Sequence, residues 1–217
     1  MEFFPVPDER IRVTHLGVSS KFFKKYSESE INQFRAKHGL VKPVILYTGS
    51  LKPHKNVKVL ISAFANLNRR SDYQLVIIGE SIKRNRELWR LITQKGLTDE
   101  IIDIGQIDSN DLPRAYQASS VAVLPSLYEG FGFSIIEAMA SGTPAVGANA
   151  GSIPEVMGNG GILFDPRSVD ALTETLEMVL TDSRLHGQLV QRGFENAAKY
   201  SWEKCTEETL KVYKDVI

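Results

Sequence analysis

The alternation of short apolar runs with longer helical patterns is the feature that most limits how this chain can fold. The runs are mostly continuous and apolar, which is typical of strands covered on both faces of a parallel sheet. The predicted strands are Val44–Thr48, Gln74–Ile78, Ile101–Ile104, Val121–Leu124, Pro144–Val146 and Ile162–Phe164. Strand–helix alternation of this length predicts right-handed crossovers and an α/β fold built on a doubly wound parallel sheet.

Helical patterns occupy the segments between and after these strands. In the first of them, apolar residues recur at the three- and four-residue spacing of a buried stripe, namely Val57, Leu60, Ile61, Phe64 and Leu67. Ser168 is a predicted N-cap for one of the later helices. The predicted helices are Val57–Arg69, Glu87–Lys95, Asn110–Ala118, Phe133–Ala140, Ile153–Met157, Val169–Leu180, Arg184–Tyr200 and Ser201–Val216.

Composition excludes several classes of partner. A chain of 217 residues is long enough for one well-buried α/β domain and short for two. The formal net charge is zero, so no overall field favours nucleic acid or an anionic membrane. Cys205 is the single cysteine, which excludes a disulfide framework and a thiolate metal site. No run reaches the roughly 18–20 apolar residues of a membrane span, and no signal-peptide core is evident, so we expect a cytoplasmic protein.

Glycines and polar residues follow the predicted strands at their carboxyl ends, where open parallel sheets bind ligands. The richest such segment runs from Glu129 to Glu137 and joins a glycine turn to a helix. Gly130 and Gly132 allow close backbone approach, and the helix start near Phe133 offers unpaired N–H groups to a phosphate. The two carboxylates can accept hydrogen bonds from sugar or ribose hydroxyls. This segment therefore predicts a sugar-nucleotide site.

Two other phosphate-binding classes are excluded by the glycine pattern. Gly49 begins neither G-x-G-x-x-G nor G-x-x-x-x-G-K-[ST]. A dinucleotide dehydrogenase or a P-loop NTPase would therefore lack its phosphate loop.

These residues resemble a known family. Glu129 and Glu137 are separated by seven residues, with Gly-Phe-Gly after the first and Ala-Met-Ala-Ser-Gly-Thr-Pro after the second. Together with Gly49–Asn56, Gly79–Glu80 and Ile153–Val156, this pattern resembles the retaining nucleotide-sugar glycosyltransferases of family four (glycosyl transferases group one). The resemblance implies a Rossmann-like domain that forms the C-terminal, donor-binding half of a two-domain GT-B fold.

The resemblance also implies a role for each site residue. Lys55 matches the family's diphosphate-binding lysine, and Glu137 the carboxylate that binds both ribose hydroxyls. Glu129 matches the glutamate that contacts the transferred sugar, so Glu129 and Lys55 are the candidate catalytic residues. The remaining candidate donor-binding residues are Gly49, Ser50, Gly105, Gln106, Gly130, Phe131, Gly132, Phe133 and Ser134, with Gly105 and Gln106 in the segment that would meet the base.

One position departs from the family pattern. The family often has an arginine directly after the glycine of the first loop, and this chain has Ser50 there. Lys52 is a candidate to replace the missing charge, and a solvated surface lysine is the alternative.

The mechanism that the resemblance implies is electrostatic. Lys55 and the helix start would stabilise the charge that grows on the leaving diphosphate. No His, Cys and carboxylate cluster with ligand spacing is present in the sequence, so we expect no metal and no cofactor apart from the nucleotide-sugar donor. Transfer with retention, by attack from the leaving-group face, would leave Glu129 and Glu137 as binding groups and not as a glycosidase-type acid or nucleophile.

We therefore expect a domain that binds a GDP- or UDP-linked hexose such as mannose or glucose. The full-length enzyme would transfer this sugar to a glycan or lipid-linked acceptor held by an N-terminal domain, and this chain by itself would not. A sugar-nucleotide epimerase of the same architecture and a non-catalytic nucleotide-sugar-binding module remain alternatives. We expect residues 1–20 to hold an interdomain linker and a first short strand within Arg12–Val18, residues 21–200 the donor-binding domain, and residues 201–217 a helix.

The expected partners follow from this assignment. They are the donor and the acceptor, with no nucleic acid. Peripheral association of the full-length protein with the cytoplasmic face of the membrane stays open.

Overall fold

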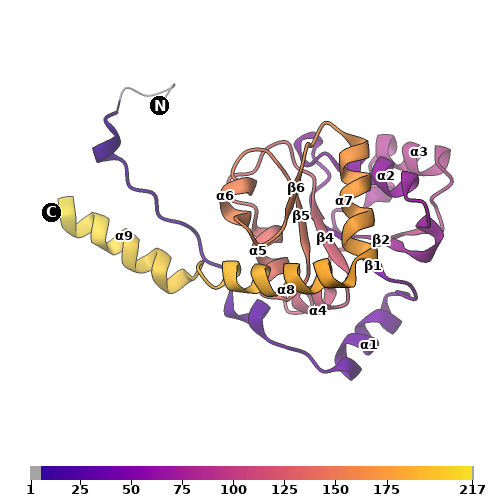
Figure 1. The fold of residues 1–217 in the computed structure, drawn as a ribbon, viewed down its shortest axis with the longest axis horizontal. Helices are drawn as coiled ribbons and strands as arrows, with labels where there is room; N and C mark the ends of the chain where they lie inside the picture. The colour runs from indigo at the N-terminus through magenta and orange to yellow at the C-terminus, as the bar shows by residue number, and fades with distance from the viewer. Residues whose placement is uncertain (1–5, 217) are drawn as a thin grey trace.

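A six-stranded parallel sheet forms the centre of the molecule in the computed structural model, which describes residues 6–216 (Figure 1). Its strands are β1 (Val44–Gly49), β2 (Gln74–Gly79), β3 (Ile101–Gly105), β4 (Val121–Leu124), β5 (Ala145–Ala148) and β6 (Ile162–Phe164). The strand order is β3-β2-β1-β4-β5-β6, and every recorded pairing is parallel. The predicted doubly wound sheet is thus confirmed. The direction of winding reverses between β1 and β4, which is where such sheets bind ligands.

Helices cover both faces of the sheet. One group packs together through contacts of α2 with α3 and α7, and comprises α2 (Val57–Asn66), α3 (Arg86–Gln94) and α7 (Val169–Thr181). The other group lies around α5 and comprises α4 (Leu112–Gln117), α5 (Phe133–Ala140), α6 (Ile153–Met157) and α8 (Ser183–Ala197). Figure 1 shows the two groups on opposite sides of the strands. Each connection therefore leaves the carboxyl edge of the sheet, runs over one face and returns to the amino edge, where the next strand begins.

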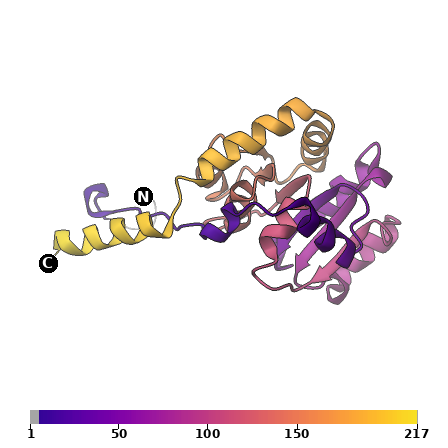
Figure 2. The same cartoon turned by 90° about the horizontal axis from the view of Figure 1, so that it is seen from below.

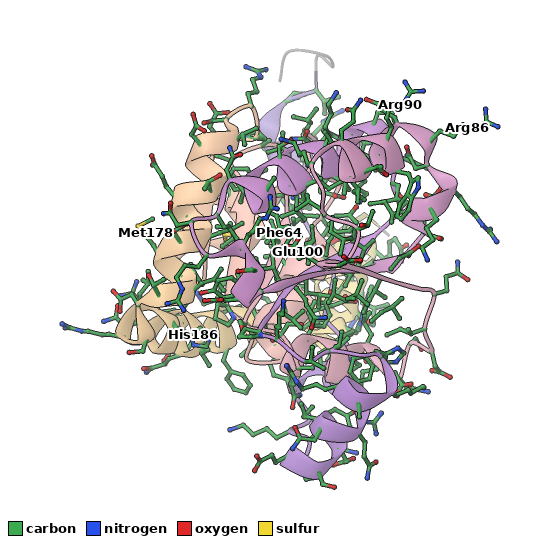
Figure 3. All side chains as sticks on the ribbon, turned by 90° about the vertical axis from the view of Figure 1, so that its right-hand side faces the viewer. Phe64, Arg86, Arg90, Glu100, Met178 and His186 are labelled. Atoms are coloured by element: carbon green, nitrogen blue, oxygen red, sulfur yellow. The ribbon has the colours of Figure 1, made fainter. Side chains whose placement is uncertain are left out.

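The apolar pattern of the sequence accounts for this layering. All five residues of the predicted stripe are buried, and Leu67 lies directly after the end of α2. Phe64, the largest of them, lies inside the layer in Figure 3, whereas Met178 points outward from α7. Ser168 caps α7 as expected, because its hydroxyl accepts a hydrogen bond from the N–H of Ala171. Burial of this stripe in one core with the strands fixes the position of the residues that follow the strands.

Two expectations about the N-terminal part differ from the structure. The described part of residues 1–20 holds no strand, and Arg12–Val18 is irregular chain, whereas residues 1–5 lie outside the described residues. This segment has no neighbouring strand with which to pair, because the sheet ends at β3 and β6. The helix α1 (Glu28–Lys37) was not predicted, although its start carries a capping box between Ser27 and Glu30.

The N-terminal segment and α9 (Trp202–Val216) leave the body of the domain in the same direction (Figures 1 and 2). They cross at the point where the N–H of Val18 donates to the carbonyl of Tyr200. Gly17 is required there because a Cβ would overlap the backbone of Trp202. Among residues 6–216, no helix combines the length and the apolarity needed to cross a membrane.

Candidate functional site

Two cavities of about 660 Å³ each open at the carboxyl ends of the strands and share Gly49. The first lies beyond the carboxyl ends of β1 and β4, where the direction of winding reverses, and we call it the switch-point cavity. It is lined by Leu16, Thr48, Gly49, Lys55, Leu112, Glu129, Gly130, Phe131, Gly132, Phe133, Ser134 and Glu137. The second lies beyond β1, β2 and β3, and we call it the edge cavity. It is lined by Gly49, Ser50, Gly79, Glu80, Ser81, Arg84, Gly105 and Gln106.

An ion pair joins the two candidate catalytic residues in the switch-point cavity. Nζ of Lys55 donates to Oε1 of Glu129 over 2.6 Å, and the two side chains are only 20% and 13% exposed. The hydroxyl of Ser126 donates to the same oxygen, also over 2.6 Å. Because the pair is largely shielded from water, each charge holds the other in a fixed position. The cation and the carboxylate are thus positioned before any ligand arrives.

The loop after β1 places Lys55 by bonding to the loop after β4. Asn56 adopts the left-handed conformation (φ 53°), and its amide donates to the carbonyls of Pro125 and Pro166. The N–H of Leu127 donates to the carbonyl of His54 over 2.8 Å. These bonds clamp the residues on either side of Lys55. An asparagine suits this position because it tolerates the left-handed conformation better than most residues.

The glycine turn before α5 presents backbone to the switch-point cavity. Gly132 has a positive φ of 96° and directly precedes the helix, so the first N–H groups of α5 face the region lined by Gly130–Ser134. The turn is held from behind, because the hydroxyl of Ser152 donates to the carbonyl of Glu129. Gly151 lies close enough to the Glu129 backbone that a Cβ would be within 3.1 Å of its nitrogen. The turn therefore offers a rigid set of donors for an anion.

Glu137 lies one turn into α5 and accepts a hydrogen bond from a buried tyrosine. The hydroxyl of Tyr116 donates to Oε2 of Glu137 over 3.0 Å. Burial raises the pKa of Glu137 to about 7, although the bond from Tyr116 and the charge of Lys21 act in the opposite direction. A carboxylate shielded in this way can accept hydrogen bonds from hydroxyls with little competition from water. This geometry suits the predicted ribose-binding role.

The edge cavity is built mainly from backbone and small residues. Gly79 has a φ of 122°, and a Cβ there would overlap the carbonyl of Gly49 on the neighbouring strand. Glu80 is used internally, because its Oε2 accepts a hydrogen bond from the N–H of Leu51 over 2.9 Å. Arg84 lines the cavity from the short helical turn Ile82–Arg84 and is exposed. The cavity thus combines main-chain groups with a solvent-facing guanidinium.

The structure brings all the candidate site residues together. Lys55, Glu129, Glu137 and the Gly130–Ser134 turn line the switch-point cavity, Ser50, Gly105 and Gln106 line the edge cavity, and Gly49 lines both. Their individual roles remain predictions. Lys52 is exposed and lines neither of these two cavities. Within residues 6–216, no group of three or more His, Cys, Asp or Glu side chains could hold a metal ion.

Comparison with known proteins assigns the family. The model of the family described as "Glycosyl transferases group 1" matches residues 29–196, which is most of the chain and includes both cavities except Leu16. The chain belongs to this glycosyltransferase family. Its fold class, predicted from the sequence, is likewise that of solved GT-B glycosyltransferases.

Relatives agree with this assignment. The chain is 35% identical over 217 residues to the O-antigen chain mannosyltransferase B of Escherichia coli, covering 99% of this chain and 57% of that protein. It is similar to the structure of sucrose-phosphate synthase from Thermosynechococcus elongatus, with a TM-score of 0.82, 28% identity and coverage of 94% of this chain and 52% of the other.

A third relative is a single domain. The solved C-terminal domain of a glycosyl transferase group 1 protein (LpcC) from Francisella tularensis is 31% identical, with a TM-score of 0.72 and coverage of 84% of this chain and 97% of that one. The chain thus spans a little over half the length of the curated relative from Escherichia coli and nearly all of an isolated C-terminal domain.

Several residues that support or line the switch-point cavity were not predicted from the sequence. Thr48, Leu112 and Leu16 line the switch-point cavity. Ser126 and Tyr116 bond its carboxylates, and Ser152 bonds the backbone of Glu129. Thr48 ends one predicted strand and Ser126 follows another. Both could therefore have been placed at the carboxyl edge, where ligands bind. Nothing in the sequence indicated a role for Tyr116, because a buried tyrosine in the helix α4 looks like an ordinary core residue.

Proposed function

We propose that this chain is the donor-binding domain of a hexosyltransferase that uses a nucleotide sugar. The observation that carries the proposal is the switch-point cavity, in which Lys55, Glu129, Glu137 and the start of α5 surround one space. The ribose hydroxyls of a nucleoside diphosphate need a hydrogen-bond acceptor, and its phosphates need a cation and N–H donors. The groups around this cavity supply all three. The epimerase alternative finds no support among the relatives described above.

The donor sugar is best assigned as a hexose carried by GDP or UDP. The Escherichia coli relative is named a mannosyltransferase, which favours mannose. The same relative is named for the O-antigen chain, which supports a glycan or lipid-linked acceptor. In this proposal the acceptor is held by a further domain of the full-length protein. Association of that protein with the membrane surface stays a prediction.

The base of the donor would occupy the edge cavity. Gly105 and Gln106 line it, and Gly105 leaves the backbone open because no atom lies within 4 Å of its Cβ position. Arg84 is a better candidate than Lys52 for the charge missing at Ser50, because Arg84 lines the same cavity as Ser50 and Lys52 does not. If the main chain recognises the base in this cavity, the identity of the base cannot be inferred from the side chains that line it.

Transfer would proceed by electrostatic stabilisation of the departing diphosphate. Lys55 and the N–H groups at the start of α5 face the place where negative charge develops. Glu129 already shares one oxygen between Lys55 and Ser126, which supports a binding role for it over that of a free nucleophile. We therefore propose retention by attack from the leaving-group face, without a metal ion.

Calorimetry of this chain against GDP-, UDP- and ADP-sugars and the free nucleotides, in the presence of EDTA, tests the proposal. We expect at least one nucleoside diphosphate to bind, and to bind more tightly than its monophosphate, because Lys55 and the helix start act on the added charge. Binding that requires added magnesium or manganese would refute the metal-free assignment. Acceptor-dependent transfer by this chain at the rate of the full-length protein would refute the assignment as a donor domain alone.

A further inference from the structure

Tyr116 does not line the switch-point cavity, but its hydroxyl contacts two residues that do. The side chain is fully buried, and its ring packs edge-on against Phe22. Its hydroxyl lies 2.9 Å from Oγ1 of Thr48 and 3.0 Å from Oε2 of Glu137, and both of these residues line the cavity. One buried hydroxyl thus joins two walls of the site that come from β1 and α5.

The second fully buried tyrosine shows what an ordinary structural hydroxyl does in this fold. Tyr47 donates to the backbone carbonyl of Ser50 over 2.6 Å, which satisfies the hydroxyl with a group that cannot ionise. Tyr116, in contrast, contacts a carboxylate whose charge can change. Its backbone is also fixed, because the hydroxyl of Thr143 donates to the Tyr116 carbonyl. The position of its hydroxyl beneath Glu137 is therefore set by the packing.

We propose that Thr48, Tyr116 and Glu137 form a hydrogen-bond relay that positions Glu137 for the ribose and couples the charge of Glu137 to the hydroxyl of Thr48. This inference rests on the proposed function, because it takes the ligand to be a nucleotide. Tyr116 acts as a positioning residue, since it reaches the ligand only through its two partners.

The number of protons in the relay fixes its direction. Tyr116 has one hydroxyl proton, so when it donates to the Glu137 carboxylate the proton of its bond with Thr48 must come from Thr48. When Glu137 is protonated on Oε2, it donates to Tyr116, and Tyr116 donates to Thr48. The Thr48 proton is then free to point into the cavity. The ionisation of Glu137 therefore decides whether Thr48 offers the ligand a donor or only an acceptor.

The surroundings of Glu137 place this change near neutral pH. Burial raises the pKa of Glu137 to about 7, and the bond from Tyr116 on α4 and the charge of Lys21 on the turn Ser20–Phe23 hold it from rising further. The other charged groups that line the cavity, Lys55 and Glu129, are paired with each other. The carboxylate is the form that accepts from both ribose hydroxyls, so the affinity should fall as the pH drops through this range.

The test compares Tyr116→Phe with Tyr47→Phe, which removes a hydroxyl of equal burial that does not touch Glu137. The ligands are GDP-mannose and UDP-glucose, because their diphosphates are esterified at both ends and lack the phosphate ionisation near pH 6 of a free nucleotide. We expect the affinity of the unmodified chain to fall by up to tenfold for each pH unit below about 7. Tyr116→Phe should move the midpoint to higher pH and weaken binding several-fold at pH 7, with recovery at pH 8.5.

The second readout does not depend on binding. Carbon NMR of labelled glutamate, with the Glu137 signal assigned through Glu137→Gln, should show a higher pKa in Tyr116→Phe, a smaller rise in Thr48→Val and none in Tyr47→Phe. An unchanged Glu137 titration in a folded Tyr116→Phe variant would overturn the relay. If the titration shifts but the unmodified chain binds neither nucleotide sugar at any pH, the proposed function and the ribose role fail while the coupling between the three residues stands.

Discussion

The two cavities at the carboxyl edge differ in how they hold their charge. In the switch-point cavity the ionisable groups are shielded and already bonded, with Lys55 to Glu129 and Glu137 to Tyr116. In the edge cavity the lining is largely glycine and small polar residues, and the cation, Arg84, is exposed. Shielded, hydrogen-bonded side chains act strongly on a phosphate and a ribose, whereas a solvated cation acts weakly. The common parts of a donor would therefore bind on one side and its variable base on the other.

Substitution where Gly79 packs against Gly49, the residue shared by the two cavities, should cause the largest loss of folding stability. Gly79→Ala places a Cβ against the carbonyl of Gly49, at a φ of 122° that disfavours side chains. We expect a loss of about 3 kcal/mol in the free energy of unfolding, the upper end of ordinary single substitutions. Gly105→Ala is the matched control, because its φ is also positive but no atom lies within 4 Å of the added Cβ, and it should cost roughly 1 kcal/mol. Denaturant unfolding measures both, and equal losses would contradict the close-approach argument.

Lys55→Met removes the cation of the switch-point cavity while keeping most of the side-chain volume. We expect diphosphate binding to weaken by about 1.5–3 kcal/mol, the scale of a hydrogen bond to a charged group. Lys52→Met is the control, because Lys52 lies nearby in the chain but lines neither cavity. Calorimetry with GDP and UDP would contradict the comparison if Lys52→Met had the larger effect.

A double variant separates ligand binding from folding at the same ion pair. Lys55→Met leaves Glu129 without its cation in a site that is 13% exposed, so the chain should also lose stability. Adding Glu129→Gln removes the unpaired charge and should recover much of that stability. Affinity for the diphosphate should stay low, because the cation is still missing. Recovery of affinity together with stability would show that Lys55 acts only through the fold.

Arg84→Ala tests the weaker, edge cavity. Because Arg84 is exposed, its contribution to diphosphate or base binding should be only about 0.5–1 kcal/mol and should shrink as salt is added. Arg86→Ala is the control, since Arg86 points outward from α3 and away from the body of the domain (Figure 3). Calorimetry at low and high salt distinguishes the two. An Arg84→Ala effect as large as that of Lys55→Met would overturn the distinction between the cavities.

The pH dependence of folding should also carry the signature of Glu137. Burial raises its pKa from 4.5 to about 7, so the folded chain holds this proton more tightly than the unfolded chain. The resulting stabilisation is complete below about pH 4.5 and is lost as the pH rises through about 7. The difference in unfolding free energy between the unmodified chain and Glu137→Gln should therefore change across this window. A constant difference would contradict the buried, partly protonated state.

Strand positions were predicted well because burial on both faces leaves a plain signal. The strands β4 (Val121–Leu124) and β6 (Ile162–Phe164) have the bounds expected from their apolar runs. The strand β1 ends at Gly49, where the first glycine-containing loop was expected to begin. The first short strand expected within Arg12–Val18 does not form, because pairing depends on a neighbouring strand that no local pattern reveals. Whether this segment forms a strand therefore depends on contacts with distant parts of the chain.

The candidate site divides along the same line. Gly130, Gly132 and the two glutamates could be found from the sequence, since turn chemistry and the family resemblance point to them directly. The bond between Lys55 and Glu129 could not, because it joins residues 74 positions apart through the packing of two loops. The support of Glu137 by Tyr116 was hidden for the same reason, and only the arrangement of α4 under α5 brings it out.

The most direct test of the division of labour is to titrate the unmodified chain, Lys55→Met and Glu137→Gln with a nucleoside and with its diphosphate. Guanosine with GDP, and uridine with UDP, provide the pairs, and calorimetry at pH 8 keeps Glu137 ionised. We predict that Lys55→Met weakens the diphosphate and leaves the nucleoside nearly unchanged, whereas Glu137→Gln weakens both by a similar factor. If Lys55→Met weakened the nucleoside as much as the diphosphate, the assignment of phosphate to Lys55 and of ribose to Glu137 would be contradicted.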